Sequence, residues 1–155
     1  MSQSPINIRQ ATPQDAQAIA DFNSLMAMET EGKTLQPDTI FSGVTNMIAN
    51  PAYGYYLVAE QDGQVVGSLM VTSEWSDWRD GLFWWIQSVY IRKEWRRQGI
   101  YRKLYDMVKT LAAENGNICG YRLYVEKDNL KAQQTYQSLG MTETDYFIYE
   151  AMTES

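Results

Sequence analysis

The chain of 155 residues contains no histidine, and this absence excludes several kinds of active site. Histidine is the commonest general base and transition-metal ligand, so Ser-His-Asp and Cys-His catalysis are excluded. The single cysteine, Cys119, excludes an internal disulfide and fits a reducing cytoplasm. One cysteine with carboxylates alone does not favour a zinc site, so we expect no metal cofactor.

Long hydrophobic runs are also absent. No stretch of about 18 apolar residues occurs, so we expect no membrane span, and residues 1–7 lack the basic start and apolar core of a signal peptide. Hydrophobic residues make up 45% and charged residues 21% of the chain, as in ordinary soluble globular proteins. We expect one cytoplasmic domain, residues 1–155, whose strand-rich aromatic surface is compatible with a homodimer.

Basic residues are concentrated in one short segment of an otherwise acidic chain. The net charge is −6, with 13 Lys and Arg against 19 Asp and Glu. Residues 92–103 hold six basic residues and one acid, Glu94, a local charge of +5 that leaves −11 for the rest. Such an island favours a local anionic ligand over a nucleic acid, which would need positive charge spread over a face.

The same segment has the order strand, glycine turn, helix. An apolar run ends at Ile91, and Gly99 precedes a helix-like segment at residues 100–115. The free N–H groups and dipole of a helix start favour a phosphate, and glycine lets the backbone approach it closely. The pattern predicts a phosphate-binding turn, although taken alone it fits a solvated basic helix start equally well.

Hydrophobic periodicity and turn residues predict strands alternating with helices. The predicted strands are residues 6–8, 55–60, 65–73, 82–91, 121–126 and 146–151, and the predicted helices are residues 13–31, 37–49, 100–115 and 129–139. Phe41, Val44 and Ile48 would face inward from the second helix. Trp84 and Trp85 would point to opposite faces of their strand, one into the core and the other toward an acceptor cleft or a dimer surface.

Two segments together resemble the GNAT superfamily of acyl-CoA-dependent N-acetyltransferases. Residues 96–101, Arg-Arg-Gln-Gly-Ile-Tyr, are similar to the family's first motif: Arg or Gln, two residues, Gly, one residue, Gly or Ala. The family's later motif is matched by Asn129, Ala132, Tyr136 and Gly140, with Met141 in place of Phe. The resemblance implies an α/β (α+β) fold with a mixed central sheet, splayed between its fourth and fifth strands and flanked by helices on both faces.

In this family the acyl-CoA lies between the two splayed strands. The resemblance implies that backbone groups at Val89, Tyr90 and Ile91 pair with the pantetheine arm. It implies cofactor contacts at Arg96, Arg97, Gln98, Gly99, Ile100, Tyr101 and Arg102, and further contacts at Asn129 and Tyr136. Tyr101 replaces a small residue of the family, so its ring must point away from the pyrophosphate. Asn129 would anchor the pantetheine or cap its helix.

The resemblance also implies the catalytic groups. Tyr136 would act as general acid, because the leaving thiolate needs a proton and a phenol of pKa about 10 can donate it; the alternative is a tyrosine on the core face of a helix. Some family members carry a Glu base on the strand before the turn, but the matching residue here is Trp85. The candidate bases are therefore a water chain or one of Glu74, Glu126, Glu29 and Glu31.

The resemblance implies an enzyme that transfers acetyl from acetyl-CoA to a primary amine by direct attack in a ternary complex. No obvious nucleophile supports a covalent intermediate. The acidic remainder of the chain favours a cationic acceptor, such as a polyamine, an aminoglycoside-like compound, an amino acid derivative, or a lysine or N-terminal amine of a protein. We expect no nucleic acid or membrane partner. The alternative function is a module that binds acyl-CoA as a sensor, without turnover.

Overall fold

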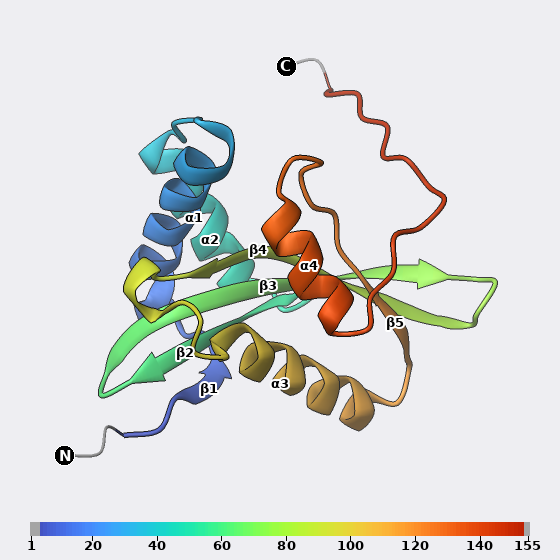
Figure 1. Cartoon of the computed structure of the whole chain (residues 1–155), viewed down its shortest axis with the longest axis horizontal. Helices are drawn as coiled ribbons and strands as arrows, with labels where there is room; N and C mark the ends of the chain where they lie inside the picture. The colour runs from blue at the N-terminus through green and yellow to red at the C-terminus, as the bar shows by residue number, and fades with distance from the viewer. Residues whose placement is uncertain (1–3, 154–155) are drawn as a thin grey trace. The chain divides into compact units, whose positions relative to one another are not determined.

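The computed structural model describes residues 4–153, and the chain divides into two compact units, Met1–Tyr124 and Val125–Ser155. The larger unit holds a five-stranded sheet of order β1-β2-β3-β4-β5 (Figure 1). Neighbouring strands are antiparallel except for β4 and β5, which are parallel. This mixed sheet confirms the predicted fold class.

The elements follow one another in the predicted order up to the fourth helix. The strands are β1 Asn7–Gln10, β2 Tyr55–Gln61, β3 Gln64–Ser76, β4 Gly81–Ile91 and β5 Ile118–Arg122. The helices are α1 Ala16–Glu31, α2 Pro37–Ala49, α3 Ile100–Asn115 and, in the smaller unit, α4 Leu130–Ser138. Short 3₁₀ turns at Pro13–Asp15 and Lys93–Trp95 precede α1 and α3.

Local signals explain where the helices begin and end. Thr12 donates its backbone N–H to the Asp15 carboxylate at 2.7 Å, which closes a capping box ahead of α1. Glycines in the left-handed region bound α3 on both sides, with φ of 77° at Gly99 and 78° at Gly116. An L side chain would be strained at either position, which is why glycine stands at both ends of the helix. The bounds of α3 therefore agree with the predicted helix at residues 100–115.

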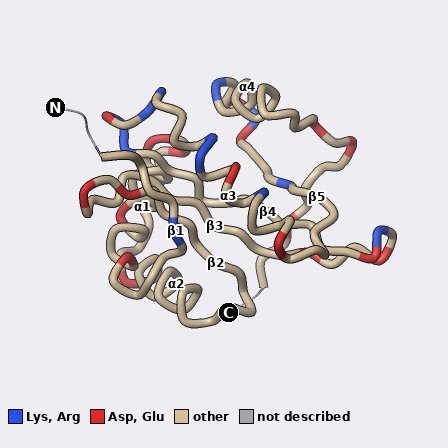
Figure 2. The backbone as a smooth tube through the Cα atoms, turned by 90° about the horizontal axis from the view of Figure 1, so that it is seen from below, with Lys and Arg blue, Asp and Glu red and all other residues tan. Residues whose placement is uncertain are grey.

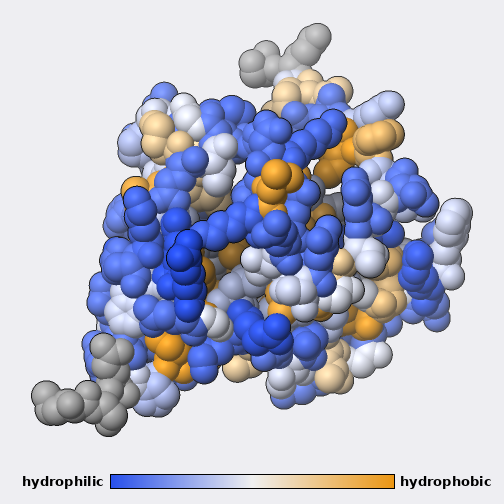
Figure 3. All heavy atoms as spheres, viewed as in Figure 1, coloured by the Kyte–Doolittle hydropathy of each residue, from blue (hydrophilic) through white to orange (hydrophobic). Residues whose placement is uncertain are grey.

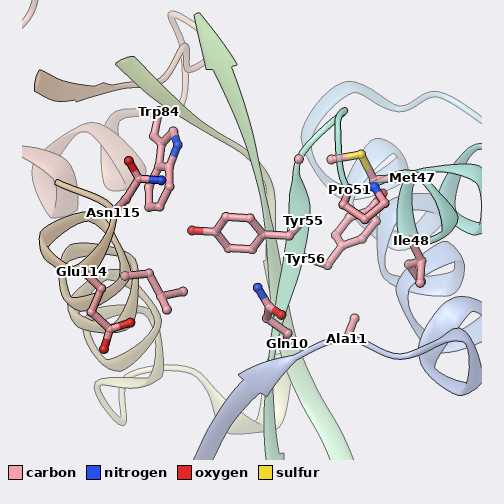
Figure 4. A pocket seen from close by; sticks show the side chains of 12 residues that line it. Gln10, Ala11, Met47, Ile48, Pro51, Tyr55, Tyr56, Trp84, Glu114 and Asn115 are labelled. Atoms are coloured by element: carbon pink, nitrogen blue, oxygen red, sulfur yellow. The ribbon is translucent and has the colours of Figure 1, made fainter. Parts of the chain in front are cut away.

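The helices of the larger unit cover both faces of the sheet. Figure 4 shows this at β2, where Tyr55 points toward α3 and the next residue, Tyr56, points toward α1 and α2. Tyr56 packs in a buried cluster with residues such as Ile19 and Val44 of α1 and α2. From α3, Leu104 and Val108 are fully buried. Each such aliphatic side chain contributes roughly 1.5–3 kcal/mol of burial free energy.

Three predictions about local structure are wrong. The fifth strand lies at Ile118–Arg122 and starts three residues earlier than predicted, because it begins two residues after Gly116, the glycine that ends α3. Within residues 141–153 the structure contains no strand, so the predicted strand at 146–151 is absent from the described part of the chain. The prediction that Phe41 faces inward is also wrong, because Phe41 is 41% exposed. On α2, Met47 is buried together with Val44.

One face of the structure is mainly hydrophilic. Hydrophilic residues dominate the face seen in Figure 3, where apolar residues appear as scattered spots. Within residues 4–153, none of the helices is both long and apolar enough to cross a membrane.

Candidate active site

The parallel pair β4 and β5 separates partway along β4. Residues Leu82 to Trp85 pair with β5, which ends at Arg122. Beyond Trp85, no strand of the described chain pairs with β4 on that side, so residues 86–91 present an open edge of backbone N–H and C=O groups. This is the predicted splay, and it includes Val89, Tyr90 and Ile91.

A β-bulge lies in the middle of this open edge. Ser68 of β3 pairs with Tyr90 and Met70 pairs with Gln87, so β4 carries one extra residue between these pairs. Ser88 takes φ of 53°, in the left-handed region. A bulge bends its strand and redirects the following backbone groups. The bulge could not be predicted from the sequence, because serine is not a typical bulge residue.

The turn after β4 has the backbone geometry of an anion site. Arg97 and Gly99 both have positive φ, of 65° and 77°, and Gly99 is the N-cap of α3. The N–H of Lys103 makes the first helical bond, to the Gly99 carbonyl at 3.1 Å. A helix start leaves the earlier N–H groups, here those of residues 100–102, without helical acceptors. Successive N–H groups in such a turn attract a phosphate.

The six basic residues of this segment divide into two groups. Arg92 is held by the fold, because its Nε donates to the Val65 carbonyl at 3.0 Å and its guanidinium lies 5.1 Å from the Phe22 ring centroid. Arg96 is also held, by contacts with β4 and α1. Figure 2 marks every Lys and Arg of the described chain in blue along the backbone. The exposed residues among the six are Lys93, Arg97, Arg102 and Lys103. These four side chains are available to meet an anion at the turn.

Tyr101, the departure from the family motif, packs along α3. Its ring stacks on Tyr105 one turn further on, with centroids 6.2 Å apart and an interplanar angle of 19°. Tyr105 in turn meets Tyr121 of β5 edge-on at 5.7 Å. Tyr101 therefore belongs to a row of aromatic rings that joins α3 to β5.

Two of the candidate bases are engaged in separate hydrogen-bonded pairs. Burial acts to raise the pKa of Glu29, but hydrogen bonds from Arg96 and Tyr90 outweigh it, and the pKa lies below its ordinary value. The pKa of Glu74 is also lowered, chiefly by the hydrogen bond from Trp85. The two acids contact β4 five residues apart, roughly 15 Å along a strand. They therefore cannot serve one site together.

The other two candidate acids are both exposed. Glu31 is exposed at the end of α1 and lies 3.4 Å from Lys33. Glu126 is an exposed residue of the smaller unit, where its backbone carbonyl accepts from the N–H of Asn129 at 3.0 Å. Within residues 4–153 no group of three or more His, Cys, Asp or Glu side chains could hold a metal ion.

Trp84 and Trp85 lie on opposite faces of β4, as predicted. Trp84 is 7% exposed and meets the Tyr55 ring edge-on at 5.5 Å. Trp85 lies on the other face, where its indole N–H donates to Glu74 at 3.0 Å and its ring lies 6.2 Å from Tyr124. This second face therefore combines aromatic rings with a carboxylate.

The smaller unit carries Asn129 and Tyr136 on α4. Asn129 is the N-cap, and its Oδ1 accepts from the N–H of Ala132 at 3.2 Å, as a capping residue should. The Tyr136 carbonyl accepts from Met141 N–H at 3.1 Å, closing the helix end around Gly140. Burial raises the pKa of the Tyr136 phenol above its ordinary value.

A cavity of about 550 Å³ lies at the opposite end of α3 (Figure 4). It is lined by Leu111, Glu114 and Asn115 of α3 and by residues of β1, α2, β2 and β4. Leu111, the first of these α3 residues, lies 12 residues after Gly99, which is roughly 18 Å along the helix. The cavity is therefore distinct from the predicted cofactor site.

Comparison with known proteins gives one family match. The family model described as "Acetyltransferase (GNAT) family" matches residues 19–141. No curated protein matches the chain.

Solved structures agree with this match. A possible acetyltransferase from Clostridium difficile 630 is 45% identical, with 98% of this chain and 100% of that chain covered and a TM-score of 0.90. A predicted acetyltransferase with acetyl-CoA from Clostridium acetobutylicum is 19% identical, with coverage of 95% and 96% and a TM-score of 0.78. AAC(6')-Iy, in complex with the bisubstrate analog CoA-S-monomethyl-acetylneamine, is 16% identical, with coverage of 97% and 99% and a TM-score of 0.76. With the splayed sheet and the turn before α3, these matches show that the chain is an acyltransferase that belongs to the GNAT acetyltransferase family.

Proposed function

We propose that this chain transfers the acetyl group of acetyl-CoA to a primary amine, by direct attack within a ternary complex. The observation that carries the proposal is the open edge of β4, residues 86–91, which leads directly into the basic turn before α3. The edge offers hydrogen-bonding groups to the pantetheine amides, and the turn offers N–H groups and positive charge to the pyrophosphate. The acetyl-CoA bound by the Clostridium acetobutylicum structure supports the same donor.

The chemistry needs two proton transfers. The amine nitrogen attacks the thioester carbonyl carbon, so a C–N bond forms while the C–S bond breaks. The departing sulfur takes the proton of the Tyr136 phenol, and the nitrogen gives its own proton to water or a carboxylate. The phenol is protonated at neutral pH, because burial only raises its pKa, so the proton is available when the thiolate forms.

We assign a cationic amine as the acceptor. The chain is acidic outside residues 92–103. Glu74 accepts a hydrogen bond from Trp85, whose ring lies 6.2 Å from that of Tyr124. Aromatic faces and a carboxylate attract an ammonium group through cation–π and charge interactions. Arg122 also contacts Glu74, at 2.9 Å, so an acceptor at this face would compete with that ion pair.

The test is an acetylation assay with amines of different charge. Spermidine and neamine supply several positive charges, a lysine peptide supplies a protein-like amine, and glutamate supplies an anionic one. The acetylated product should be measured by mass spectrometry, because the exposed thiol of Cys119 would react with the reagents that detect released CoA. We expect turnover with the polycations. Turnover of only neutral or anionic amines would refute the acceptor class, and acetyl-CoA binding without any turnover would favour a sensor.

A further inference from the structure

Glu29, at the end of α1, contacts both parts of the cofactor site described above. Its Oε1 accepts from the Tyr90 hydroxyl at 3.1 Å, on the open edge of β4. Its Oε2 accepts from the Arg96 guanidinium at 2.9 Å, in the turn that follows. One carboxylate, 67 residues before Arg96 in sequence, therefore links the strand and the turn.

Arg96 is held in place from three directions. Besides its bond to Glu29, its Nε donates to the carbonyl of Ile91, the last residue of β4, at 2.8 Å. Its guanidinium lies 5.2 Å from the centroid of the Tyr90 ring. The side chain is thus folded back onto the strand end. Charge-assisted hydrogen bonds of this kind are about twice as strong as neutral ones.

The turn needs such support because its backbone is strained. Arg97, directly after Arg96, takes φ of 65°, which a non-glycine residue adopts only at a cost of about 1–3 kcal/mol. Surrounding contacts must hold such a residue in place. Arg96 directly precedes the strained residue Arg97, so its contacts hold the backbone at that point. The hydrogen bond to Glu29 is one of these contacts.

We propose that Glu29 is a positioning residue: through Arg96 and Tyr90 it holds the turn in the shape that receives the CoA pyrophosphate. The inference rests on the proposed function, since it takes acetyl-CoA as the donor. It assigns Glu29 a role different from proton transfer, because both carboxylate oxygens already accept hydrogen bonds from the cofactor edge. Arg96 then supports the shape of the turn, and the residues next to Arg96 carry the contacts with the phosphates.

The test compares two acetyl donors in the variant Glu29→Gln. Acetyl-CoA carries the pyrophosphate, whereas acetyl-pantetheine has the same thioester without it. We expect acetyl-CoA to bind about tenfold more weakly by calorimetry, the scale of one lost charge-assisted hydrogen bond. Its KM should rise while kcat at saturation stays within about twofold, and kcat/KM with acetyl-pantetheine should not change. Asp21→Asn, an exposed acid of the same helix, is the matched control.

Further variants separate this role from a loss of folding. Glu29→Asp should recover part of the affinity, and Glu29→Gln with Arg96→Gln should weaken binding no more than the larger single effect, because the two residues act as a unit. A fall in kcat with both donors at unchanged KM would overturn the inference and make Glu29 a base. Unchanged acetyl-CoA affinity in Glu29→Gln would also overturn it. Failure of the unmodified chain to bind acetyl-CoA would overturn the proposed function itself, and this inference with it.

Discussion

Trp85 of β4 donates its indole N–H to the carboxylate of Glu74 on the neighbouring strand, at 3.0 Å. Arg122 of β5 donates to the same oxygen at 2.9 Å. By the family resemblance, Trp85 occupies the position where some members carry a glutamate. In this chain the carboxylate next to that position is Glu74 of β3, and Trp85 donates a hydrogen bond to it.

Replacing Trp85 by Phe should raise the pKa of Glu74 toward its ordinary value. The indole bond stabilises the charged carboxylate and is the main reason that this pKa is lowered. The titration of the Glu74 side-chain carboxyl can be followed by NMR. Trp75→Phe is the control, because Trp75 is adjacent to Glu74 on β3 and 55% exposed. An unchanged midpoint in Trp85→Phe would show that the neighbouring arginines, Arg122 and Arg79, lower this pKa without the indole bond.

Replacing Tyr136 by Phe should lower kcat by about 10²-fold or more, since positioned general acids contribute roughly 10²–10⁴. The affinity for acetyl-CoA should stay within about twofold, because the ring remains. Steady-state kinetics and calorimetry measure the two quantities. Tyr149→Phe, at a tyrosine of the smaller unit that is 92% exposed, removes the same atom as a control. Full activity in Tyr136→Phe would remove Tyr136 from the mechanism.

The pH dependence of stability should include a contribution from Asp15. Arg9 donates to its two carboxylate oxygens at 2.7 and 3.0 Å, and these bonds lower the pKa of Asp15. The ionised carboxylate therefore stabilises the fold above its ordinary pKa of about 4, and this contribution disappears as the pH falls through the folded-state pKa. Asp15→Asn should lose about 2 kcal/mol at pH 7.

Urea unfolding at pH 7 and at about pH 2 measures this difference. The unmodified chain and Asp15→Asn should converge at low pH. Asp21→Asn, at an exposed site, should differ little from the unmodified chain at either pH. A constant difference between Asp15→Asn and the unmodified chain would mean that packing, and not charge, explains the loss.

Alanine substitutions at Gly99 and Gly43 should change the stability of the fold in opposite directions. A Cβ at Gly99 or at Gly43 would meet no atom within 4 Å, so neither substitution creates a clash. Gly99→Ala should lower stability by about 1 kcal/mol, because φ is 77° there. Gly43→Ala, inside α2, should raise it by about 0.5–1 kcal/mol. Thermal unfolding of both variants is the measurement, and equal signs would contradict the conformational explanation.

The ends of α3 could be predicted from the sequence because they depend on neighbouring residues. Glycine at positions 99 and 116 has the freedom that a helix end in the left-handed region requires, so local chemistry was sufficient. The same is true of Asp62 and Gly63, the two residues between β2 and β3. Asp-Gly is a typical hairpin sequence, and both residues have positive φ, of 52° and 79°. The basic turn before α3 could be identified for the same reason.

Features that depend on distant residues could not be predicted. The segment around Tyr146 and Ile148 has the apolar character of a strand, but a strand also needs a pairing partner, and periodicity cannot supply one. Glu29 and Arg96 are 67 residues apart, and no spacing rule connects them. The sequence could therefore indicate that Arg96 belongs to the basic turn before α3 but not how its side chain is held.

The open edge of β4 also has a consequence for handling the protein. An unpaired strand edge can take up a strand of another molecule, which is the usual beginning of aggregation. Here the bulge at Ser88 interrupts the regular spacing of the edge, so a straight incoming strand can match only a few of its residues. Preparations without cofactor should consequently be the more prone to aggregate, with the bulge limiting how far such contacts grow.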